Sequence, residues 1–555
     1  MSFLNKVFQS IPVKIPDRSG FDLSHEVLST AKVGTVTPIT HFEVLPGDTI
    51  SMGSLMKVTL PPMAVPFMGR IDAELTAAFI PYRLLWAGWQ GFITQNNGVQ
   101  SDVRPGDANG MNIPISVPLI ELSNDDLPNT SNGYDACAGS LADYLGVKLE
   151  RSDNIPIDQH KYVSAMKFLA YHKFCDDWIR DDNNMKPFFP KVPYTRWNND
   201  GSNSTLSAGS FNPGMLPFDP NGGRALYGSQ VVTLSLSSAS INLGSASTGA
   251  SVPVDTSIKL GSLRQRCWAK DYFTTATTRP QSGAASSVMF DTSGATGSFT
   301  ISTLRAANSL QKWMERNNIA GTEYGDQIMA HFGVRPPDAV LNRSVLLGSV
   351  RTPVYVGSVE NKAGVGDNGA TGTKSPFGNV LGAAAGFASG GDKGTLIDDF
   401  TVKEHGVIMV FFTLIPHAYY NSGTDREMLH TGYGDFAWPE FANIGDQEIK
   451  NSELVASAIG SGIFGYNQRY SEYKFLKDRI AGELREGQSL DVYALQRSFI
   501  YPIPQLGKEF LTIPTNFLDQ VTGVSSELSE FGCMVDAYFD CQALRILPEY
   551  SLPSL

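Results

Sequence analysis

Side chains able to catalyse reactions or bind metals occur in this sequence, but their spacing matches no catalytic motif. The segment Gly369 to Ser375 approaches a phosphate-binding loop, yet Thr373 stands where that motif requires a glycine before the lysine. No G-x-S-x-G serine-hydrolase sequence occurs, and His25 is not followed by a second histidine at zinc-protease spacing. These patterns predict no catalytic residue, no metal site and no cofactor.

A short acidic segment with a histidine and a cysteine is the next candidate for chemistry. His172, Cys175, Asp176 and Asp177 have the residue types of a metal or nucleophile site. We interpret them as the polar side of an amphipathic helix, which is the more common use of such residues. His405 lies two positions before the apolar run that starts at Val407, and we expect a neighbouring group to hydrogen-bond to it at the end of a strand.

One basic segment has a composition suited to nucleic acid. Arg264, Arg266 and Lys270 alternate with Trp268 and Tyr272. Proteins hold single strands by combining phosphate contacts with base stacking on aromatic rings. These residues are therefore candidates for facing DNA. A solvated strand edge or a salt-bridged subunit face explains the same residues, and we favour that explanation slightly.

A second cluster consists of aromatic residues that follow Pro81. Tyr82, Trp86 and Trp89 lie within eight positions of one another. Aromatic side chains at this density are typical of a core or a subunit interface, and less often of a ligand site. We take these three residues as candidates for a subunit interface.

The elements that position these residues are mainly strands. Phe42 to Leu45 leads into the turn signal Pro46-Gly47-Asp48, and the segments Ile50 to Leu60 and Ile71 to Ile80 continue as strands. The apolar run Val407 to Ile415 predicts a buried strand. Periodic apolar residues predict helices near 158–180 and 302–317, and a shorter one from Tyr324 to Phe332 that ends at Gly333.

Three long segments rich in Ser, Gly, Asn and Thr predict loops: 198–261, 281–298 and 360–393. The first contains a small island of alternating apolar residues, Val231 to Leu236, which is typical of a short strand. Because this loop cannot bury a core, we expect it on the surface.

The composition describes a large acidic protein with few charges. Of 555 residues, 42% are hydrophobic and 18% are charged, with a net charge of −12. A dedicated nucleic-acid binder normally has a basic balance, so any contact with DNA requires a local patch or a basic helper. The five cysteines form no C-x-x-C pair and indicate free thiols in a reducing cytoplasm. Val407 to Ile415 is too short to span a membrane, and we expect no signal peptide.

Nine segments, which occur in the same order as in the family, together resemble the major capsid protein of the microviruses. The likeness is greatest to the gokushovirus branch of that family. Microviruses are small tailless icosahedral phages with single-stranded DNA. The segments are Phe21 to His25, Glu43 to Thr49, Ile80 to Trp86, Trp178 to Asp181, Asp271 to Thr274, His331 to Val334 with Pro337 to Ala339, Glu404 to Gly406, Asp435 to Pro439 and Phe464 to Tyr470. The sequence departs from the gokushovirus pattern in its loops, since 198–261 is expanded.

The resemblance implies an all-β fold, an eight-stranded antiparallel jelly roll of the viral capsid type. A single capsid domain, 1–555, would take its strands from 35–80 and 400–545, and 81–400 would hold long loop insertions and a few helices. Sixty copies would form a T=1 shell around circular single-stranded DNA, with a separate small basic protein inside. Such a protein belongs to the virion and is made and assembled in the bacterial cytoplasm.

Host contact is expected from the loop 198–261. Near a three-fold axis, Val232, Leu234 and Leu236 of three copies would pack together and carry a surface projection that meets a receptor on the bacterium. A carbohydrate-binding or carbohydrate-hydrolysing β protein is the alternative reading, because such chains are also acidic and rich in aromatic residues and glycine. Two opposed carboxylates in a cleft would favour that alternative.

Overall fold

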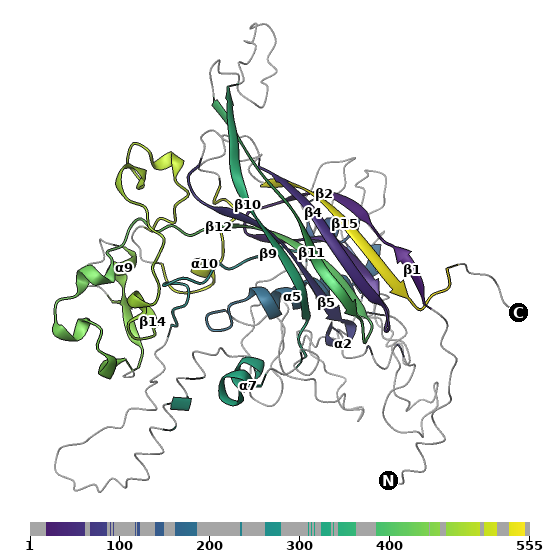
Figure 1. The fold of residues 1–555 in the computed structure, drawn as a ribbon, viewed down its shortest axis with the longest axis horizontal. Helices are drawn as coiled ribbons and strands as arrows, with labels where there is room; N and C mark the ends of the chain where they lie inside the picture. The colour runs from purple at the N-terminus through teal and green to yellow at the C-terminus, as the bar shows by residue number, and fades with distance from the viewer. Residues whose placement is uncertain are drawn as a thin grey trace, which may run out of the picture.

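Strands dominate the part of the chain that the structure describes (Figure 1). The structure is a computed structural model, and it describes residues 18–60, 67–85, 89, 93, 117, 119–122, 139–148, 161–185, 233–235, 261–278, 309, 312–313, 316, 324–334, 337, 342–361, 384–442, 445–455, 462–499, 504–518 and 532–549. The main sheet has ten strands: β1 (Ser19–Asp22), β2 (His25–Ala31), β3 (Thr35–Val44), β4 (Thr49–Thr59), β5 (Ile71–Pro81), β9 (Arg264–Gln265), β10 (Val345–Asn361), β11 (Ala384–Thr401), β12 (Gly406–Pro416) and β15 (Cys533–Arg545).

The eight longest strands form two four-stranded halves with antiparallel pairing throughout. One half has the order β2-β15-β4-β11 and the other β3-β12-β5-β10, and β10 joins them by pairing with both β5 and β11. The two halves share one core, in which Met56 of β4 and Phe539 of β15 belong to the same cluster as Leu75 of β5 and Phe412 of β12. The all-β prediction is confirmed, and the strand order is consistent with the expected jelly roll.

Two strands of this sheet come from the region assigned to insertions. β10 lies within 81–400 and β11 lies there except for its last residue, and β11 begins inside the segment 360–393, for which the sequence predicts a loop. Its glycines explain the error, because they serve close packing between strands. A Cβ on Gly394 would lie 2.7 Å from Val350 Cγ2, and one on Gly390 would lie 2.8 Å from the Pro353 carbonyl oxygen. Glycine inside a strand often marks such an approach of another chain segment.

Helices cover the outer face of the half that contains β12. They are α2 (Tyr82–Leu85), α4 (Leu141–Tyr144) and α5 (Met166–Phe174). Phe174 of α5 stacks on Phe411 of β12 with 3.9 Å between ring centroids. Every residue of β12 is buried: five of its side chains lie in the core between the sheets, and Val407, Met409 and Phe411 lie beneath the helices. The buried strand predicted at Val407 to Ile415 is confirmed.

The helix predictions had mixed outcomes. Residues 158–180 contain β7 (Lys161–Ser164), then α5, then a π-helical turn (Cys175–Ile179), so the helix starts later than predicted. α7 (Tyr324–Phe332) is confirmed and ends at Gly333, whose φ of 70° suits glycine. Within 302–317 only residues 309, 312–313 and 316 are described, all as helix, and the loop 281–298 lies outside the described residues.

Two small sheets complete the strands. β6 (Leu119–Leu122) pairs with β7 and with β8 (Thr233–Ser235), and β13 (Gln447–Lys450) pairs with β14 (Ile463–Asn467). The second sheet belongs to a lobe that lies beside the main sheet (Figure 1). We define the aromatic lobe as the described residues of 417–499. Its short helices are η4 (Arg426–Leu429), η5 (Tyr433–Asp435), η6 (Pro439–Phe441), α9 (Asn451–Leu454), η7 (Ser471–Tyr473), η8 (Gly482–Leu484) and η9 (Asp491–Tyr493), with α10 (Lys508–Leu511) beneath them.

Candidate assembly and nucleic-acid surfaces

The basic segment that suggested DNA is tied into the folded chain. Arg264 lies in β9, which pairs with β3, and its Nε is 3.2 Å from Nδ1 of the buried His172. Arg266 forms an ion pair of 2.8 Å with Glu74, and burial lowers its pKa. Lys270 donates to Asp181, although its side chain remains half exposed. The charge of Arg266 and Lys270 is therefore compensated within the chain.

The aromatic residues of the same segment are not available to bases. Trp268 is 3% exposed, packs edge-on against Phe517 with centroids 5.1 Å apart, and has the Arg497 guanidinium 5.0 Å from its ring. Tyr272 is also buried, and its hydroxyl donates to Glu453 at 2.7 Å. Base stacking on Trp268 is therefore ruled out in this conformation, because the ring is already enclosed by the chain's own side chains.

The polar residues 172–177 span the end of α5 and the π-helical turn, and the burial of His172, Cys175 and Asp176 corrects the interpretation of them as the polar side of an amphipathic helix. Asp177 accepts hydrogen bonds from Lys173 at 2.7 Å and from the Ser344 hydroxyl at 2.7 Å, so it fastens the helix to the start of β10. Burial raises the pKa of the Cys175 thiol to about 12, and the thiol is inert at neutral pH. Among the described residues, no group of three or more His, Cys, Asp or Glu side chains is arranged to hold a metal ion.

The aromatic cluster after Pro81 packs inside the chain where the structure describes it. Tyr82 is buried, and its ring meets Trp89 edge-on with centroids 4.9 Å apart. Trp89 in turn lies 5.8 Å from the ring of His405, whose carbonyl oxygen accepts the Tyr82 N–H at 3.1 Å. The Tyr82 side chain is thus part of the core beneath α2 and is not exposed for contact with a second copy. Trp86 lies outside the described residues.

A surface that the sequence did not single out lies on the aromatic lobe. Large apolar side chains project from its short helices and turns, and Leu476 is 91% and Tyr433 82% exposed. We define the lobe surface as Met428, Tyr433, Phe436, Trp438, Tyr473, Phe475 and Leu476, all of them exposed. Soluble monomers rarely expose such groups together, and apolar patches of this kind mark interaction sites.

The lobe surface is ordered even though it is exposed. The Asp435 carboxylate accepts the backbone N–H groups of Thr431 at 2.9 Å and Gly432 at 2.8 Å, and these bonds lower its pKa. The Trp438 indole donates to the Tyr433 carbonyl oxygen at 2.9 Å. These bonds fix the turns from which the aromatic rings project. A surface held in this way loses little entropy when a partner binds.

Beneath this surface lies an ion-pair network. Glu453 accepts from Tyr272 at 2.7 Å and from Arg426 at 2.8 Å, while Glu472 accepts from Gln447 at 2.5 Å. Glu472 also lies 3.9 Å from the same Arg426 guanidinium. The two carboxylates share a cation and hold the lobe together.

The alternating island of loop 198–261 is partly described. Thr233–Ser235 forms β8 and pairs in parallel with β6 of the same chain. A strand at this position was predicted and is confirmed, but its partner is a neighbouring segment of its own chain. Only the backbone of Leu234 is described, and Val232 and Leu236 lie outside the described residues.

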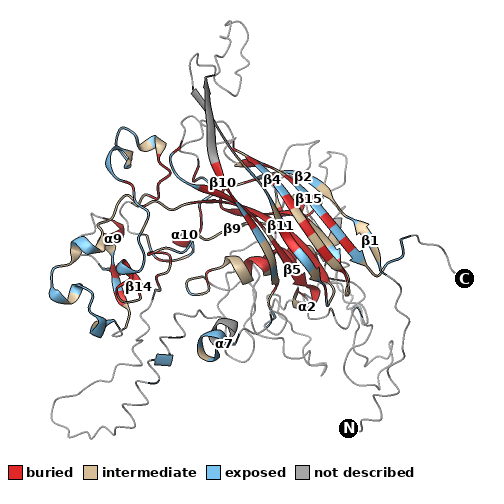
Figure 2. Cartoon of the chain, in the orientation of Figure 1, coloured by how far each residue is buried: buried red, intermediate tan, exposed pale blue. Residues whose placement is uncertain are grey.

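Sequence reasoning did not group the residues of the lobe surface together, because they follow no helix or strand period. A usable signal was the number of large apolar residues in the turn-rich stretch between Arg426 and Leu476, where no regular element buries them. Figure 2 shows this lobe with many exposed segments beside the buried strands of the main sheet. No helix in the described part of the chain is long and apolar enough to cross a membrane.

Comparison with known proteins agrees with this architecture. The family model "Capsid protein (F protein)" matches residues 9–555. The chain is 28% identical to "Capsid protein VP1" of Bdellovibrio phage phiMH2K, covering 99% of this chain and 97% of the relative. It is 25% identical to the protein of that name from Chlamydia phage 1, covering 100% of this chain and 98% of the relative. It is also 25% identical to the protein of that name from Spiroplasma virus 4, covering 97% of this chain and 95% of the relative. With a family model that covers nearly its whole length, this chain belongs to the phage capsid protein (F protein) family.

Proposed function

We propose that this protein is the major shell-forming subunit of a microvirus, and that sixty copies enclose a circular single-stranded DNA genome in a T=1 icosahedron. The observation that carries the proposal is the lobe surface, where apolar side chains such as Tyr433 and Leu476 are held in place and left open to solvent. A second copy that buries them supplies the apolar core of a stable interface. The family is one of structural, non-enzymatic proteins, so no reaction is assigned to the chain.

The experiment compares two substitutions on the lobe surface with one elsewhere. We expect Tyr433→Ser with Leu476→Ser to leave folding unchanged, because both side chains are more than four-fifths exposed. Loss of two interface anchors at about 2 kcal/mol each raises the subunit concentration needed for assembly by about two to three orders of magnitude. Phe332→Ser, at the end of α7 and 78% exposed outside the lobe, is the matched control. Closed particles from the double variant at normal yield, seen by electron microscopy, contradict the proposal.

The acidic charge of the chain supports a further partner. With a net charge of −12, the shell protein repels the DNA it encloses, and a small basic protein packaged with the genome offsets that repulsion. Within the candidate DNA segment, Lys270 is the side chain that reaches solvent, and it is the residue we propose for phosphate contact. Lys270→Gln should lower the salt dependence of DNA binding by up to about one unit of slope. An unchanged slope leaves Lys270 as an anchor for Asp181.

Host recognition is proposed for the loop 198–261. Its composition supports a surface position, and its island Val232, Leu234 and Leu236 has the alternation of a strand that packs on one face. Replacing residues 202–257 by a Gly-Ser linker should give intact particles that no longer adsorb to host cells. Intact particles that adsorb normally contradict this role.

A further inference from the structure

One face of the main sheet is open and carries large apolar side chains. In the half formed by β2, β15 and β4, residues alternate between the core and the outside, and Leu28, Leu55, Met534 and Tyr538 point outward. Leu28 is 77% and Met534 54% exposed. Unlike the β12 side, this face has no described helix packed across it (Figure 1). Large apolar side chains exposed together on one sheet face mark an interaction site.

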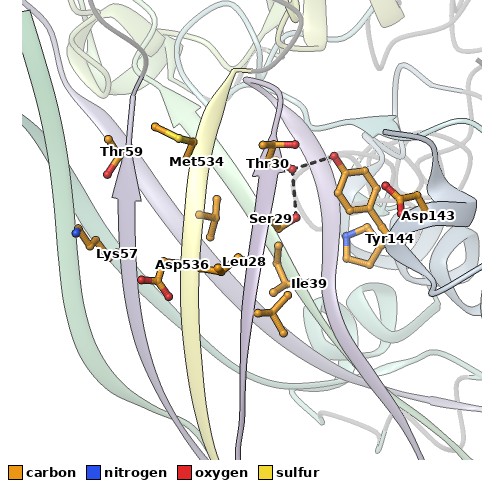
Figure 3. Close-up of a pocket in the computed structure, with 13 residues that line it drawn as sticks. Leu28, Ser29, Thr30, Ile39, Lys57, Thr59, Asp143, Tyr144, Met534 and Asp536 are labelled. Atoms are coloured by element: carbon orange, nitrogen blue, oxygen red, sulfur yellow. Dashed lines mark hydrogen bonds between the residues drawn. The ribbon is translucent and has the colours of Figure 1, made fainter. Parts of the chain in front are cut away.

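The face contains a slot beside β2 (Figure 3). It has a volume of about 620 Å³ and is lined by Val27–Thr30 of β2, Pro38 and Ile39 of β3, Lys57 and Thr59 of β4, Met534–Asp536 of β15, and Asp143 and Tyr144 of α4. The Tyr144 hydroxyl donates to the Thr30 carbonyl oxygen at 2.9 Å and fixes the wall on the α4 side. Most of its exposed lining is apolar, and its charged residues are the carboxylates of Asp143 and Asp536 and the single lysine Lys57.

Backbone groups also face this slot. β2 pairs with β15 along one edge only, and no described strand pairs with its other edge. The bond from Tyr144 to the Thr30 carbonyl shows that Thr30 points its backbone away from β15. Since backbone direction alternates in an antiparallel pair, Leu28 points its backbone the same way. An extended segment in the slot can therefore hydrogen-bond to β2 as well as cover its side chains.

We propose that residues 1–17 of this protein occupy the slot. They directly precede β1, which belongs to the same sheet. Their sequence supplies the chemistry that the slot needs. The apolar residues include Phe3, Leu4, Val7, Phe8, Ile11, Val13 and Ile15. Lys6 and Lys14 outnumber the one acid, Asp17, and so complement Asp143 and Asp536.

The reach of the segment is sufficient. β1 places Ser19 opposite Arg545, whereas the slot lies at Met534, eleven positions back along β15. That separation is about 36 Å at about 3.3 Å per residue, and seventeen extended residues reach about 56 Å. A segment that turns back at Arg18 brings the group from Phe3 to Phe8 level with the slot. A segment of this length is also long enough to reach the slot of an adjacent copy. In either case we propose the same occupant, residues 1–17.

The test is a disulfide cross-link. Leu28→Cys adds a thiol on an exposed side chain, and we combine it in turn with Phe3→Cys, Leu4→Cys, Val7→Cys and Phe8→Cys. Mild oxidation should link at least one pair, within a chain or between two chains, which mass spectrometry of the digested band distinguishes. The matched control pairs the same four cysteines with Leu490→Cys, an exposed side chain of the aromatic lobe, and should give no link.

A second measurement covers the case in which no pair has disulfide geometry. Met534→Cys is labelled by a maleimide in the full-length chain and in a variant that lacks residues 2–15. Cover by the segment should slow labelling by about tenfold or more, and the deletion should remove that protection. Equal labelling of the two chains, together with no cross-link, overturns the proposal. Protection that appears only in assembled particles and survives the deletion also overturns it, and assigns the slot to another occupant.

Discussion

The two halves of the main sheet differ in what lies on their outer faces. On the β12 side, α5 covers the strands, and both Phe411 and Phe412 are buried although they point in opposite directions. On the β15 side, Val535 is buried while Met534 is exposed. A strand covered on both faces can be apolar throughout, whereas a strand covered on one face alternates. The difference shows that one outer face of the sandwich is covered by helices of the same chain, and that the other is open in the described part of the chain.

Tyr171 shows how the covered face is fixed. Its hydroxyl is fully buried on α5, donates to the Val36 carbonyl oxygen at 2.8 Å and accepts the Arg264 N–H at 2.7 Å. Burial raises the pKa of this hydroxyl well above its ordinary value. A buried polar group with both bonds formed stabilises one helix position over others. Among the described residues of the open face, Tyr144 beside the slot makes a bond of this kind, to the Thr30 carbonyl oxygen.

The largest effect is expected from the covered face. Phe411→Ala and Phe412→Ala should each lower the free energy of unfolding by about 3–5 kcal/mol, because each ring is fully buried and leaves a cavity. Urea unfolding of the unassembled subunit, followed by tryptophan fluorescence, measures both values. If Phe411→Ala costs less than about 1 kcal/mol while Phe412→Ala costs several, α5 does not form part of the stable core.

Much of the fold was predictable where local sequence and burial agree. The run Val407 to Ile415 is apolar at every position because β12 is buried on both faces, and α7 has a clear period and a terminal Gly333. The strands β10 and β11 were not predicted, because the glycines that permit their close packing are also typical of loops. Composition alone does not separate these two uses of glycine.

The candidate sites were less predictable because their partners lie far away in the sequence. Arg266 pairs with Glu74, and Lys270 pairs with Asp181, and neither carboxylate is recognisable from the basic segment itself. Trp268 is enclosed by Phe517 and Arg497, more than two hundred positions further along the chain. A basic and aromatic segment therefore predicts a cluster of charges and rings. Whether that cluster faces solvent depends on the tertiary structure.

An intermediate effect is expected from pH, again on the covered face. Burial, with a smaller contribution from Lys167 of α5, lowers the pKa of His41 on β3 from 6.5 to about 4. Because the unfolded chain binds the proton more tightly, this histidine contributes stability that is present above pH 6.5 and lost as pH falls towards 4. The total is up to about 3 kcal/mol, at about 1.4 kcal/mol per pKa unit.

His41→Gln removes this titration. Between pH 6.5 and 4, the free energy of unfolding of the variant should fall less steeply than that of the parent, whereas the two should change in parallel above pH 7. Denaturant unfolding at half-unit pH steps gives both curves. Equal slopes in the acid range would mean that His41 titrates alike in the folded and unfolded chains.

The smallest effect is expected from the open face, and two adjacent residues of β4 provide the test. Leu55 is 51% exposed on the outer side, and Met56 is 1% exposed in the core. Met56→Ala should cost about 2–5 kcal/mol, and Leu55→Ala should change stability by no more than about 0.5 kcal/mol, since solvent already surrounds much of that side chain. At Phe411 and Phe412, by contrast, substitution of either adjacent residue lowers the free energy of unfolding. The comparison therefore distinguishes a strand covered on one face from a strand covered on both. A cost above about 1 kcal/mol for Leu55→Ala in the unassembled subunit would show that this part of the face is covered before assembly. The same measurement on a chain that lacks residues 2–15 would then show whether the N-terminal segment provides that cover.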